Sequence, residues 1–553
     1  MRHRCAFIAT AAIAAAASLG LPSPAAADWP IYGHDLSNTR NAGSEGPAAT
    51  KVPSLARAWK FEAPNSFTGT PVVADGVVVA GTHGGLVYGL SALNGEKLWE
   101  KRVGAPVNGS AAIDVDAAGG PTAYVPVAEL GGPRLVALSL ADGAQQWETV
   151  LTNQADSSVF GSATFWKGTL YIGTSGPNND DSRARGSVVA LDQKTGRIRW
   201  QTFTVPEGRD GAAVWSTPAI DTATGRLYVG TGNNYHEPTT DTENAILALD
   251  ASSGAIVGKF QATPNDAFSA DNPTGPDFDF GASPNLIEGP NGEKLVGEGQ
   301  KSGVYWAFDR GTLQPVWQTM VGPGGILGGI LGSTAYDGTR IYGADTIDGQ
   351  VFGLGRDGKL NWESQDSGGL HLSPASVANG VVYTVDQSGS LVARDPASGN
   401  VLARLPLDGP SFGGVSAVGG ALFVAVGTGP PPEPLPQNDG SGSIVAFGDT
   451  SSLGGTSGGG QPGSQPRGGR LRLSVTPRRV RAGRLVTLRF RVLGGGRPLA
   501  RARVHVGGRR SRTAANGRAS LRVRFHAPGL RSVRASRPGF GRAVVKLRVL
   551  RRR

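Results

Sequence analysis

One short pattern recurs eight times in this chain of 553 residues, and it constrains the fold more than any other feature. Each copy has two or three apolar residues, then Ala-Leu-Asp or a variant, a turn with glycine, and often a tryptophan. The copies lie between residues 87 and 452, roughly 40–58 residues apart. A second unit, strand then Asp-Gly or Asn-Gly turn then strand, separates them. Four short strands per repeat predict an all-β chain with an eight-bladed β-propeller.

The chemistry of the repeat supports this prediction. Asp in the turn can bond backbone amides, glycine supplies a positive φ, and tryptophan on the next strand can pack flat between neighbouring blades. The last copy breaks off after IVAF at residues 444–447. We therefore expect the strand SLARAWKFEA, residues 54–63, to complete the last blade and close the ring without a long free edge.

The first 27 residues predict a secretory signal peptide. Arg2 and Arg4 precede an apolar run that ends in three alanines, with cleavage expected before Asp28, so we expect a secreted protein. Cys5 is the only cysteine and lies in this segment. The mature chain is therefore expected to have no disulfide, no thiolate nucleophile, no cysteine-bound metal and no covalently attached haem.

Composition divides the remainder into three parts. We assign residues 28–449 to the propeller and residues 450–469, rich in Gly, Ser and Pro, to a flexible linker. Residues 470–553 alternate apolar and polar side chains between short turns. This alternation predicts a small, basic, immunoglobulin-like β-sandwich after the propeller.

The net charge of +11 conceals a strong asymmetry. Residues 467–553 hold 27 Lys and Arg and no Asp or Glu, whereas the rest of the chain has 27 basic and 43 acidic residues. Phe490, Phe525 and Phe540 are the only aromatic residues of this segment, so a stacking platform for specific nucleic-acid binding is not expected. We expect contact with anionic cell-surface polymers, and the alternative is a solubilising module.

Three longer motifs connect the repeat to a known family. The turn A-L-D-x-x-T-G-x-x-x-W resembles the propeller repeat of pyrroloquinoline-quinone (PQQ) proteins. DWPIYGHDLSNTRNAG, residues 28–43, is similar to the opening of quinoprotein alcohol dehydrogenases. GPDFDFGASPNL, GQKSGVYWAFD and GILGGILGSTAYDG resemble the polyvinyl-alcohol dehydrogenase branch. The resemblance covers about residues 28–449.

This resemblance implies the positions of cofactor and metal. It places Trp215, expected on an inner strand, beneath a flat PQQ, and makes Asn233 a Ca²⁺ ligand. The bound metal would polarise a quinone carbonyl as a Lewis acid. Ser175 matches a serine near a cofactor carboxylate, and Lys301 in QKSG matches the basic residue that contacts the quinone oxygens.

The same resemblance implies which carboxylate acts as the catalytic base. The family base corresponds to Asp279 in PDFDFG, also a metal neighbour, with Asp277 as the second choice. It would take the proton of the substrate hydroxyl while hydride passes to the quinone.

The chain also departs from the family pattern. Asn178 stands where the family has a glutamate that binds metal and cofactor, with Asp180 or Asp181 as possible replacements. Gly109 replaces an arginine, and Thr68 stands near the place of another glutamate. Part of the family's carboxylate and metal cage therefore lacks its usual side chains in this chain.

Two functions remain open at this point. One is a secreted PQQ-dependent dehydrogenase that oxidises an alcohol, including a polymeric secondary alcohol, and passes electrons to an external acceptor such as a cytochrome. The other is a cofactor-free propeller that serves as a binding or assembly scaffold. They differ in one structural expectation: in the enzyme, Trp215, Asn233, Asp279 and Lys301 share one axial cavity.

Overall fold

The computed structural model describes residues 28–177, 182–269, 271–366, 369–427, 440–453, 471–494, 497–499, 502–506, 509–514, 516–537 and 540–551. Strands dominate, and helix is limited to two short 3₁₀ turns, η1 (Ala49–Ser54) and η2 (Ser451–Leu453). The expected signal peptide and most of the expected linker lie outside these residues. Within them, no helix is long and apolar enough to cross a membrane.

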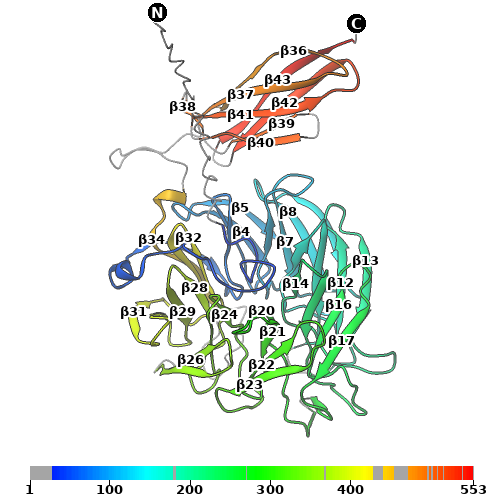
Figure 1. Ribbon diagram of the computed structural model, residues 1–553, viewed down its shortest axis with the longest axis vertical. Coiled ribbons are helices and arrows are strands. Elements are labelled where there is room, and N and C mark those ends of the chain that lie inside the picture. The colour runs from blue at the N-terminus through cyan, green and yellow to red at the C-terminus, as the bar shows by residue number, and fades with distance from the viewer. Residues whose placement is uncertain are drawn as a thin grey trace, which may run out of the picture.

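Eight four-stranded antiparallel sheets follow one another and form the blades of a propeller, which confirms the predicted fold class (Figure 1). Blade 1 comprises β2 (Val72–Ala74), β3 (Val77–Gly81), β4 (Leu86–Ser91) and β5 (Lys97–Arg102). Blade 2 comprises β6 (Ala112–Asp114), β7 (Thr122–Val127), β8 (Arg134–Ser139) and β9 (Gln145–Val150). Blade 3 comprises β10 (Thr164–Trp166), β11 (Thr169–Thr174), β12 (Ser187–Asp192) and β13 (Ile198–Phe203). Blade 4 comprises β14 (Ala219–Asp221), β15 (Arg226–Gly230), β16 (Ala245–Asp250) and β17 (Ile256–Gln261).

The second half of the ring repeats this order. Blade 5 comprises β20 (Asn285–Glu288), β21 (Lys294–Gly299), β22 (Val304–Asp309) and β23 (Pro315–Met320). Blade 6 comprises β24 (Ala335–Tyr336), β25 (Arg340–Ala344), β26 (Gln350–Gly355) and β27 (Leu360–Gln365). Blade 7 comprises β28 (Ser376–Ala378), β29 (Val381–Val385), β30 (Ser390–Arg394) and β31 (Val401–Pro406). Blade 8 comprises β32 (Val415–Val418), β33 (Gly420–Val426), β34 (Ser441–Asp449) and β1 (Arg57–Pro64).

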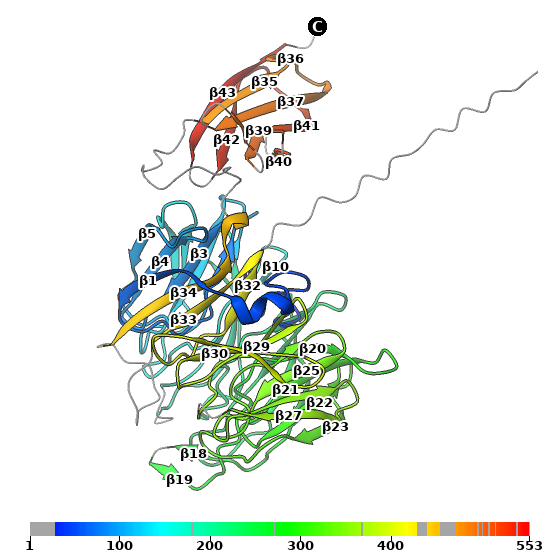
Figure 2. The same ribbon diagram turned by 90° about the vertical axis from the view of Figure 1, so that its left-hand side faces the viewer.

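The ring closes by pairing its two ends. Strand β1 lies antiparallel to β34 along blade 8 (Figure 2). Phe61 is opposite Ile444 in this pairing. The strand expected at residues 54–63 therefore completes the last blade, and this prediction is confirmed. Pairing of the first and last strands joins distant parts of the chain and removes an exposed sheet edge.

The repeat tryptophans hold neighbouring blades together. Trp99 donates from Nε1 to the carbonyl of Leu140 at 2.9 Å, and its ring covers Gly143 in the turn of the next blade. A Cβ on Gly143, which has φ +68°, would lie 2.7 Å from that ring. The glycine thus serves both the turn and the packing, and the expected tryptophan wedge is confirmed.

Blade 4 exchanges the partners of this contact. Its outer strand has Gly258 at the tryptophan position, opposite Ala248, and the turn of blade 5 has Leu313 where other turns have glycine. Leu313 is buried and keeps the positive φ of the turn at +57°. A Cβ on Gly258 would contact Leu313 Cδ1 at 3.4 Å. At this position the turn, and not the strand, carries the large side chain, and the space between the blades is filled all the same.

The opening motif forms an axial plug, which we define as residues 29–42. Its backbone carbonyls accept hydrogen bonds from the innermost strands of blades 1, 2, 4, 5, 6 and 7, so the segment runs along the inner side of the ring. The donors and acceptors are Val73 N to Trp29 O, Ile113 N to Pro30 O, Ile220 N to Leu36 O, Leu286 N to Ser37 O, Tyr336 N to Thr39 O and Val377 N to Arg40 O.

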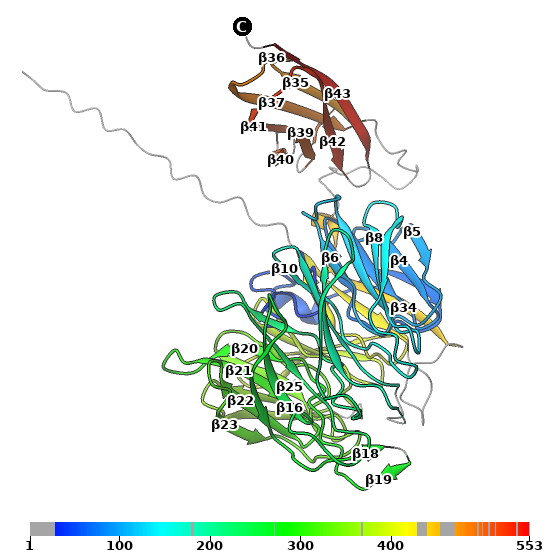
Figure 3. The same cartoon turned by 90° about the vertical axis from the view of Figure 1, so that its right-hand side faces the viewer.

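The chain after the propeller folds into two packed sheets. One contains β35 (Leu471–Thr476), β37 (Leu485–Gly494), β38 (Arg497–Pro498) and β41 (Arg518–Arg524). The other contains β36 (Arg479–Arg481), β43 (Phe540–Leu550), β42 (Gly529–Arg537), β39 (Arg503–Val506) and β40 (Arg509–Arg512). Leu488, Phe490, Val504 and Leu547 lie in the core between them. The two sheets form the β-sandwich expected after the propeller, and the immunoglobulin-like likeness stays a prediction (Figure 3).

Candidate active site

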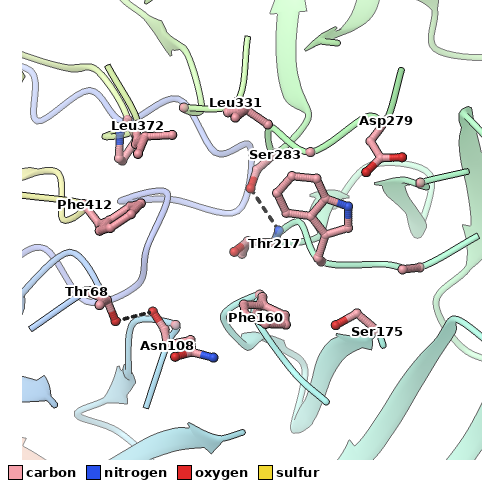
Figure 4. A pocket seen from close by; sticks show the side chains of 18 of the residues that line it. Thr68, Asn108, Phe160, Ser175, Thr217, Asp279, Ser283, Leu331, Leu372 and Phe412 are labelled. Atoms are coloured by element: carbon pink, nitrogen blue, oxygen red, sulfur yellow. Dashed lines mark hydrogen bonds between the residues drawn. The ribbon is translucent and has the colours of Figure 1, made fainter. Parts of the chain in front are cut away.

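Hydroxyl groups link the blades around the axis just before their innermost strands. The backbone N–H of Ser110 donates to Ser162 Oγ at 2.8 Å, and that of Ser162 donates to Thr217 Oγ1 at 3.1 Å. Thr217 N–H donates in turn to Ser283 Oγ at 2.9 Å, and Ser283 N–H to Ser333 Oγ at 2.8 Å (Figure 4). These hydrogen bonds join the segments that precede the innermost strands of neighbouring blades, and so hold those segments in place.

A glycine precedes several of these hydroxyl residues for a steric reason. A Cβ on Gly109 would lie 2.6 Å from the carbonyl oxygen of Gly161 in the next blade. The backbone therefore has no room for a side chain at residue 109, where the family pattern has an arginine. Thr68, at the other departure, faces the same space and donates to the carbonyl of Asn108 at 3.1 Å.

The ring encloses a cavity of about 340 Å³. Side chains and backbone of all eight blades and of the axial plug line it, and Tyr32 of the plug donates to Ser333 Oγ at 2.7 Å. The sequence-predicted residues that line this one cavity are Trp215, Asn233, Asp279, Lys301 and Ser175. The enzyme hypothesis required Trp215, Asn233, Asp279 and Lys301 to share one axial cavity, and they do. Asn178, Asp180 and Asp181 lie outside the described residues.

Trp215 lies in the segment that leads into β14, four residues before the strand begins. The expectation that it sits on the inner strand was wrong, because the strand starts only after the hydroxyl step at Thr217. The indole is half-buried and lies against Gly281, where any side chain would collide with the ring. This contact limits the movement of the ring, which also borders the cavity.

Asp279 is held from two sides. Its Oδ1 accepts the backbone N–H of Asn233 at 2.7 Å, and its Oδ2 lies 3.1 Å from Lys301 Nζ. Lys301 Nζ also contacts both carboxylate oxygens of Asp277 at 2.9 Å and lies 5.7 Å from the centroid of the Trp215 ring. Of the two acids, Asp279 borders the cavity, whereas Asp277 is buried behind the lysine. This arrangement favours the first choice of acid.

The side chain of Asn233 is oriented by its own amide hydrogens. Nδ2 donates to the carbonyls of Asn234 and Phe268, each at 2.7 Å. Both hydrogens are therefore used, and Oδ1 is the polar atom left to bind a ligand. Such a carbonyl oxygen is a donor that Ca²⁺ accepts.

The fit for a metal is partial. Asn233 Oδ1 and the Asp279 carboxylate are oxygen donors, but Ca²⁺ takes about six to eight. The part of the chain that the structure describes contains no group of three or more His, Cys, Asp or Glu able to hold a metal ion. The planar quinone fits better, because the cavity offers a fixed indole face, a lysine and the hydroxyl of Ser175.

A buried acid network behind Asn233 was missed from the sequence. Glu243 is fully buried and accepts the backbone N–H groups of Asn234 and Asp266, both at 3.3 Å. Asp266 in turn accepts the N–H of Asp277 at 3.2 Å. Burial raises the pKa of Glu243 to about 7. The network sets the backbone from which Asn233 and the acid insert project.

The acids Asp266, Asp277 and Asp279 belong to the segment between β17 and β20, residues 262–284, which we call the acid insert. Part of the acid insert extends outward as a hairpin of β18 (Phe268–Ser269) and β19 (Asn272–Pro273), visible at the bottom of Figure 2. The run Thr242-Glu243-Asn244 just before an apolar strand was the available signal for the network. From the sequence alone this run could not be distinguished from an ordinary polar turn, because Glu243 and Asp266 come close together only when the acid insert is folded.

The opposite side of the cavity is apolar. Leu331, Leu372 and Phe412 come from the loops of blades 6 to 8 and face the cavity, and Phe160 also lines it (Figure 4). Ile326 and Leu327 extend this surface to the rim and are 52% and 46% exposed. Large apolar side chains exposed at a cavity mouth are typical of a binding surface. The motif that resembles the polyvinyl-alcohol dehydrogenase branch contains the rim residues, but the sequence did not show that they border the site.

Comparisons with known proteins identify the family of the chain. A family model of PQQ repeats (PQQ_2), described as outer membrane protein assembly factor BamB, matches residues 49–245 and 242–429. Polyvinylalcohol dehydrogenase of Sphingopyxis sp. (strain 113P3) is 27% identical over 476 residues, covering 73% of each chain. Polyvinylalcohol dehydrogenase of Pseudomonas sp. is 30% identical over 348 residues, 57% of this chain and 54% of that relative.

Solved structures show the same fold. The crystal structure of quinohemoprotein alcohol dehydrogenase from Comamonas testosteroni has a TM-score of 0.64 at 19% identity, covering 80% of this chain and 82% of that one. A europium-containing methanol dehydrogenase has a TM-score of 0.65 at 16% identity, covering 76% and 98%. Since the family model matches more than half of the residues, the chain belongs to the PQQ-repeat family of β-propellers and is an alcohol dehydrogenase-like member of it.

Proposed function

We propose that the protein is a PQQ-dependent dehydrogenase that oxidises an alcohol by hydride transfer to the quinone. The observation that carries the proposal is the meeting of Trp215, Asn233, Asp279 and Lys301 at one axial cavity. The names of the relatives support the reaction class, since they include polyvinylalcohol dehydrogenases and quinohemoprotein alcohol dehydrogenases.

The residues at the cavity divide the work of such a reaction. When bound, PQQ supplies the two-electron acceptor for the hydride. Trp215 offers a rigid aromatic face for a planar ring system. Lys301 offers an ammonium group for quinone oxygens or carboxylates. Asn233 Oδ1 and Asp279 would contribute oxygen ligands to a Ca²⁺ ion, which acts as a Lewis acid on a carbonyl.

Asp279 is the proton acceptor in this scheme. Its carboxylate is fixed by the N–H of Asn233 and by Lys301, and it borders the space where an alcohol would lie. It would take the hydroxyl proton as hydride leaves the carbinol carbon. The buried pair with Lys301 keeps the carboxylate from turning away from the cavity.

The apolar side of the cavity supports a secondary alcohol with a hydrocarbon backbone, including a polymer. Leu331, Leu372 and Phe412 offer no hydrogen-bond partner to a second hydroxyl, whereas they can cover methylene groups. The exposed rim at Ile326 and Leu327 gives a chain longer than the cavity an apolar surface on which to continue.

Location and partners extend the proposal. The leader-like residues 1–27 support secretion, and an external acceptor such as a cytochrome would receive the electrons, because the sequence has no haem-attachment motif. The basic residues after position 467 support contact with anionic cell-surface polymers.

Titration with PQQ and Ca²⁺, followed by dye reduction with simple alcohols and polyvinyl alcohol, tests the enzyme proposal. We expect binding at micromolar PQQ and alcohol-dependent dye reduction. Trp215→Ala is expected to lose PQQ binding, whereas Trp166→Ala, a half-buried tryptophan away from this cavity, should bind as the parent does. No PQQ binding by the parent at micromolar concentration would instead support a scaffold propeller.

The scaffold alternative rests on two observations. The backbone excludes a side chain at Gly109, and the described residues supply few metal donors. A propeller of this kind would bind partners without redox chemistry, in line with the assembly-factor description of the matching family model.

Asp279→Asn is expected to lower kcat by about 10²–10⁴-fold, because the amide cannot accept the hydroxyl proton. PQQ affinity, measured by titration, should change much less. Asp271→Asn makes the same substitution at an exposed residue of the same insert and serves as the control. Equal kcat values for the parent and Asp279→Asn would remove Asp279 from the role of base.

A further inference from the structure

The basic sandwich presents two differently placed sets of charges. At one edge, Arg503 of β39 lies 2.6 Å from Asp75 Oδ2 in blade 1. Arg510 of β40 donates to the carbonyls of Asp116 and Ala117 in blade 2, at 2.9 and 3.2 Å. Figure 3 shows β40 on the side of the sandwich that faces the propeller. These arginines therefore have partners within the chain.

The outer face of the other sheet has a different environment. We define the arginine face as the exposed arginines of β35, β37 and β41, which are Arg472, Arg489, Arg491, Arg518, Arg522 and Arg524. Among the residues that the structure describes, none of these six takes part in an ion pair with an acidic group. The segment from residue 467 onward has no Asp or Glu that could supply one locally.

Strand pairing sets the spacing of these charges. Arg491 lies directly opposite Arg518, and Arg489 lies opposite Ser520, between Arg518 and Arg522 on the neighbouring strand. The intervening residues of β37, Leu488, Phe490 and Val492, point into the core, so every second residue must face outward. Neighbouring strands lie about 4.8 Å apart and alternate residues about 7 Å apart. The result is a rigid lattice of positive charge.

Like charges opposite one another oppose strand pairing. The fold keeps them together without an internal counter-charge, although the same sandwich pairs arginines with acids at its β39–β40 edge. An external polyanion would relieve this repulsion. Its charges need to recur along a chain, because the face is a row of sites without an enclosed cavity.

We propose that the arginine face binds a linear, phosphate-bearing polymer of the cell surface. Guanidinium groups match phosphate oxygens with two parallel charge-assisted hydrogen bonds, and a phosphate polymer repeats this group along its chain. The face has no exposed aromatic ring on which a base could stack. Among the residues whose exposure the structure describes, Leu485 is the one exposed large apolar residue on these strands, too small a surface for insertion into a membrane. This inference is independent of the dehydrogenase activity.

Binding of the full chain to long-chain polyphosphate, measured over a series of salt concentrations, tests the proposal. The variant Arg489→Gln/Arg491→Gln/Arg522→Gln is expected to weaken binding at least tenfold and to reduce the salt slope by about two to three units. A variant with lysine at the same three positions keeps the charge but loses the paired N–H donors of the guanidinium group. Its polyphosphate affinity should lie between those of the parent and the glutamine variant. Circular dichroism checks that each variant is folded.

The matched control removes three exposed charges from the second sheet, as Arg534→Gln/Lys546→Gln/Arg548→Gln. It should change polyphosphate affinity less than about threefold, although the net charge is the same as in the first variant. Equal weakening by both triple variants would overturn a defined face. Tighter binding to single-stranded DNA, or to phosphatidylglycerol vesicles at equal phosphate concentration, would assign the face to those partners and overturn the polymer proposal.

Discussion

Asp279 shows how a side chain chosen from a motif obtains its place from residues distant in sequence. It is held by the backbone of Asn233, 46 residues earlier, and by Lys301. The resemblance identified all three, because the short motifs around them are readable in the sequence. It ranked Asp279 ahead of Asp277, and the folded chain is consistent with that order, since it puts Asp279 at the cavity and Asp277 behind the lysine.

The Glu243 carboxyl carries a testable pH dependence. Burial raises its pKa from 4.5 in a free side chain to about 7 in the folded chain. The folded state therefore holds this proton more tightly than the unfolded state does, and the associated stability is lost as pH rises between these two values. This is the opposite sign from a salt-bridged carboxylate.

Glu243→Gln is expected to remove this pH dependence. The difference in unfolding free energy between variant and parent should shift in favour of the variant between pH 4.5 and pH 8, by about 3 kcal/mol at most. Denaturant unfolding at several pH values measures it. Glu207→Gln changes an exposed glutamate and should show no such trend. A constant difference across this pH range would contradict the buried-acid account.

At the scale of elements, the contact between a strand and the next turn sets blade spacing. In six of the eight blades a tryptophan on the outer strand covers a turn glycine, whereas between blades 4 and 5 Gly258 faces Leu313. The sequence shows that Gly258 and Leu313 each depart from the repeat. That Leu313 fills the space beside Gly258 follows only from the distance between the blades.

Restoring the usual pair tests this complementarity. Gly258→Trp alone should be destabilising through overpacking against Leu313, and Leu313→Gly alone should cost about 2–4 kcal/mol through a cavity. The double variant should recover part of this loss, with a favourable coupling of about 1 kcal/mol or more. Denaturant unfolding of the four proteins gives the cycle, and strictly additive effects would show that the two positions are independent.

The rim loop leads to a specificity prediction. Ile326→Ser/Leu327→Ser should lower kcat/KM for long-chain secondary alcohols by about tenfold, because each residue covers methylene groups. Short alcohols, which stay inside the cavity, should be affected less than about twofold. Steady-state kinetics on a homologous series measures this. Leu130→Ser/Val316→Ser removes two exposed apolar residues elsewhere, and an equal loss there would argue against a rim contact.

At the scale of the whole molecule, the axial plug joins parts of the ring that are far apart in sequence. Arg40 is fully buried and donates from Nε to Ala375 O at 2.6 Å and from Nη2 to Ser376 Oγ at 3.0 Å. Burial lowers its pKa to about 10, so it stays charged at neutral pH. Arg40 thereby ties the plug to blade 7, and Tyr32 of the same plug lines the cavity.

Arg40→Met is expected to lower the unfolding free energy by about 3 kcal/mol, because buried carbonyls lose a charged donor. Denaturant unfolding of the full chain measures this loss. Arg57→Met removes a surface pair with Asp408 and should cost less than about 1 kcal/mol. If both variants are equally stable, the plug contributes little to holding the ring.

The sequence by itself determined the repeat, the turns, the closing strand and the residue types at the site. These features are local, because hydrophobic periodicity and turn chemistry are set by neighbours within a few residues. Even the closing strand was inferred from a local absence, a last repeat that breaks off after its IVAF strand.

Only the tertiary structure decided which features of the sequence meet. Four features depend on distances across the fold: the path of residues 29–42 along six blades, the exclusion of a side chain at Gly109, the contact of Asp279 with the cavity, and the division of the arginines between two sheets. Closure of the ring sets those distances. They are properties of packed blades, and no window of sequence contains both partners of such a contact.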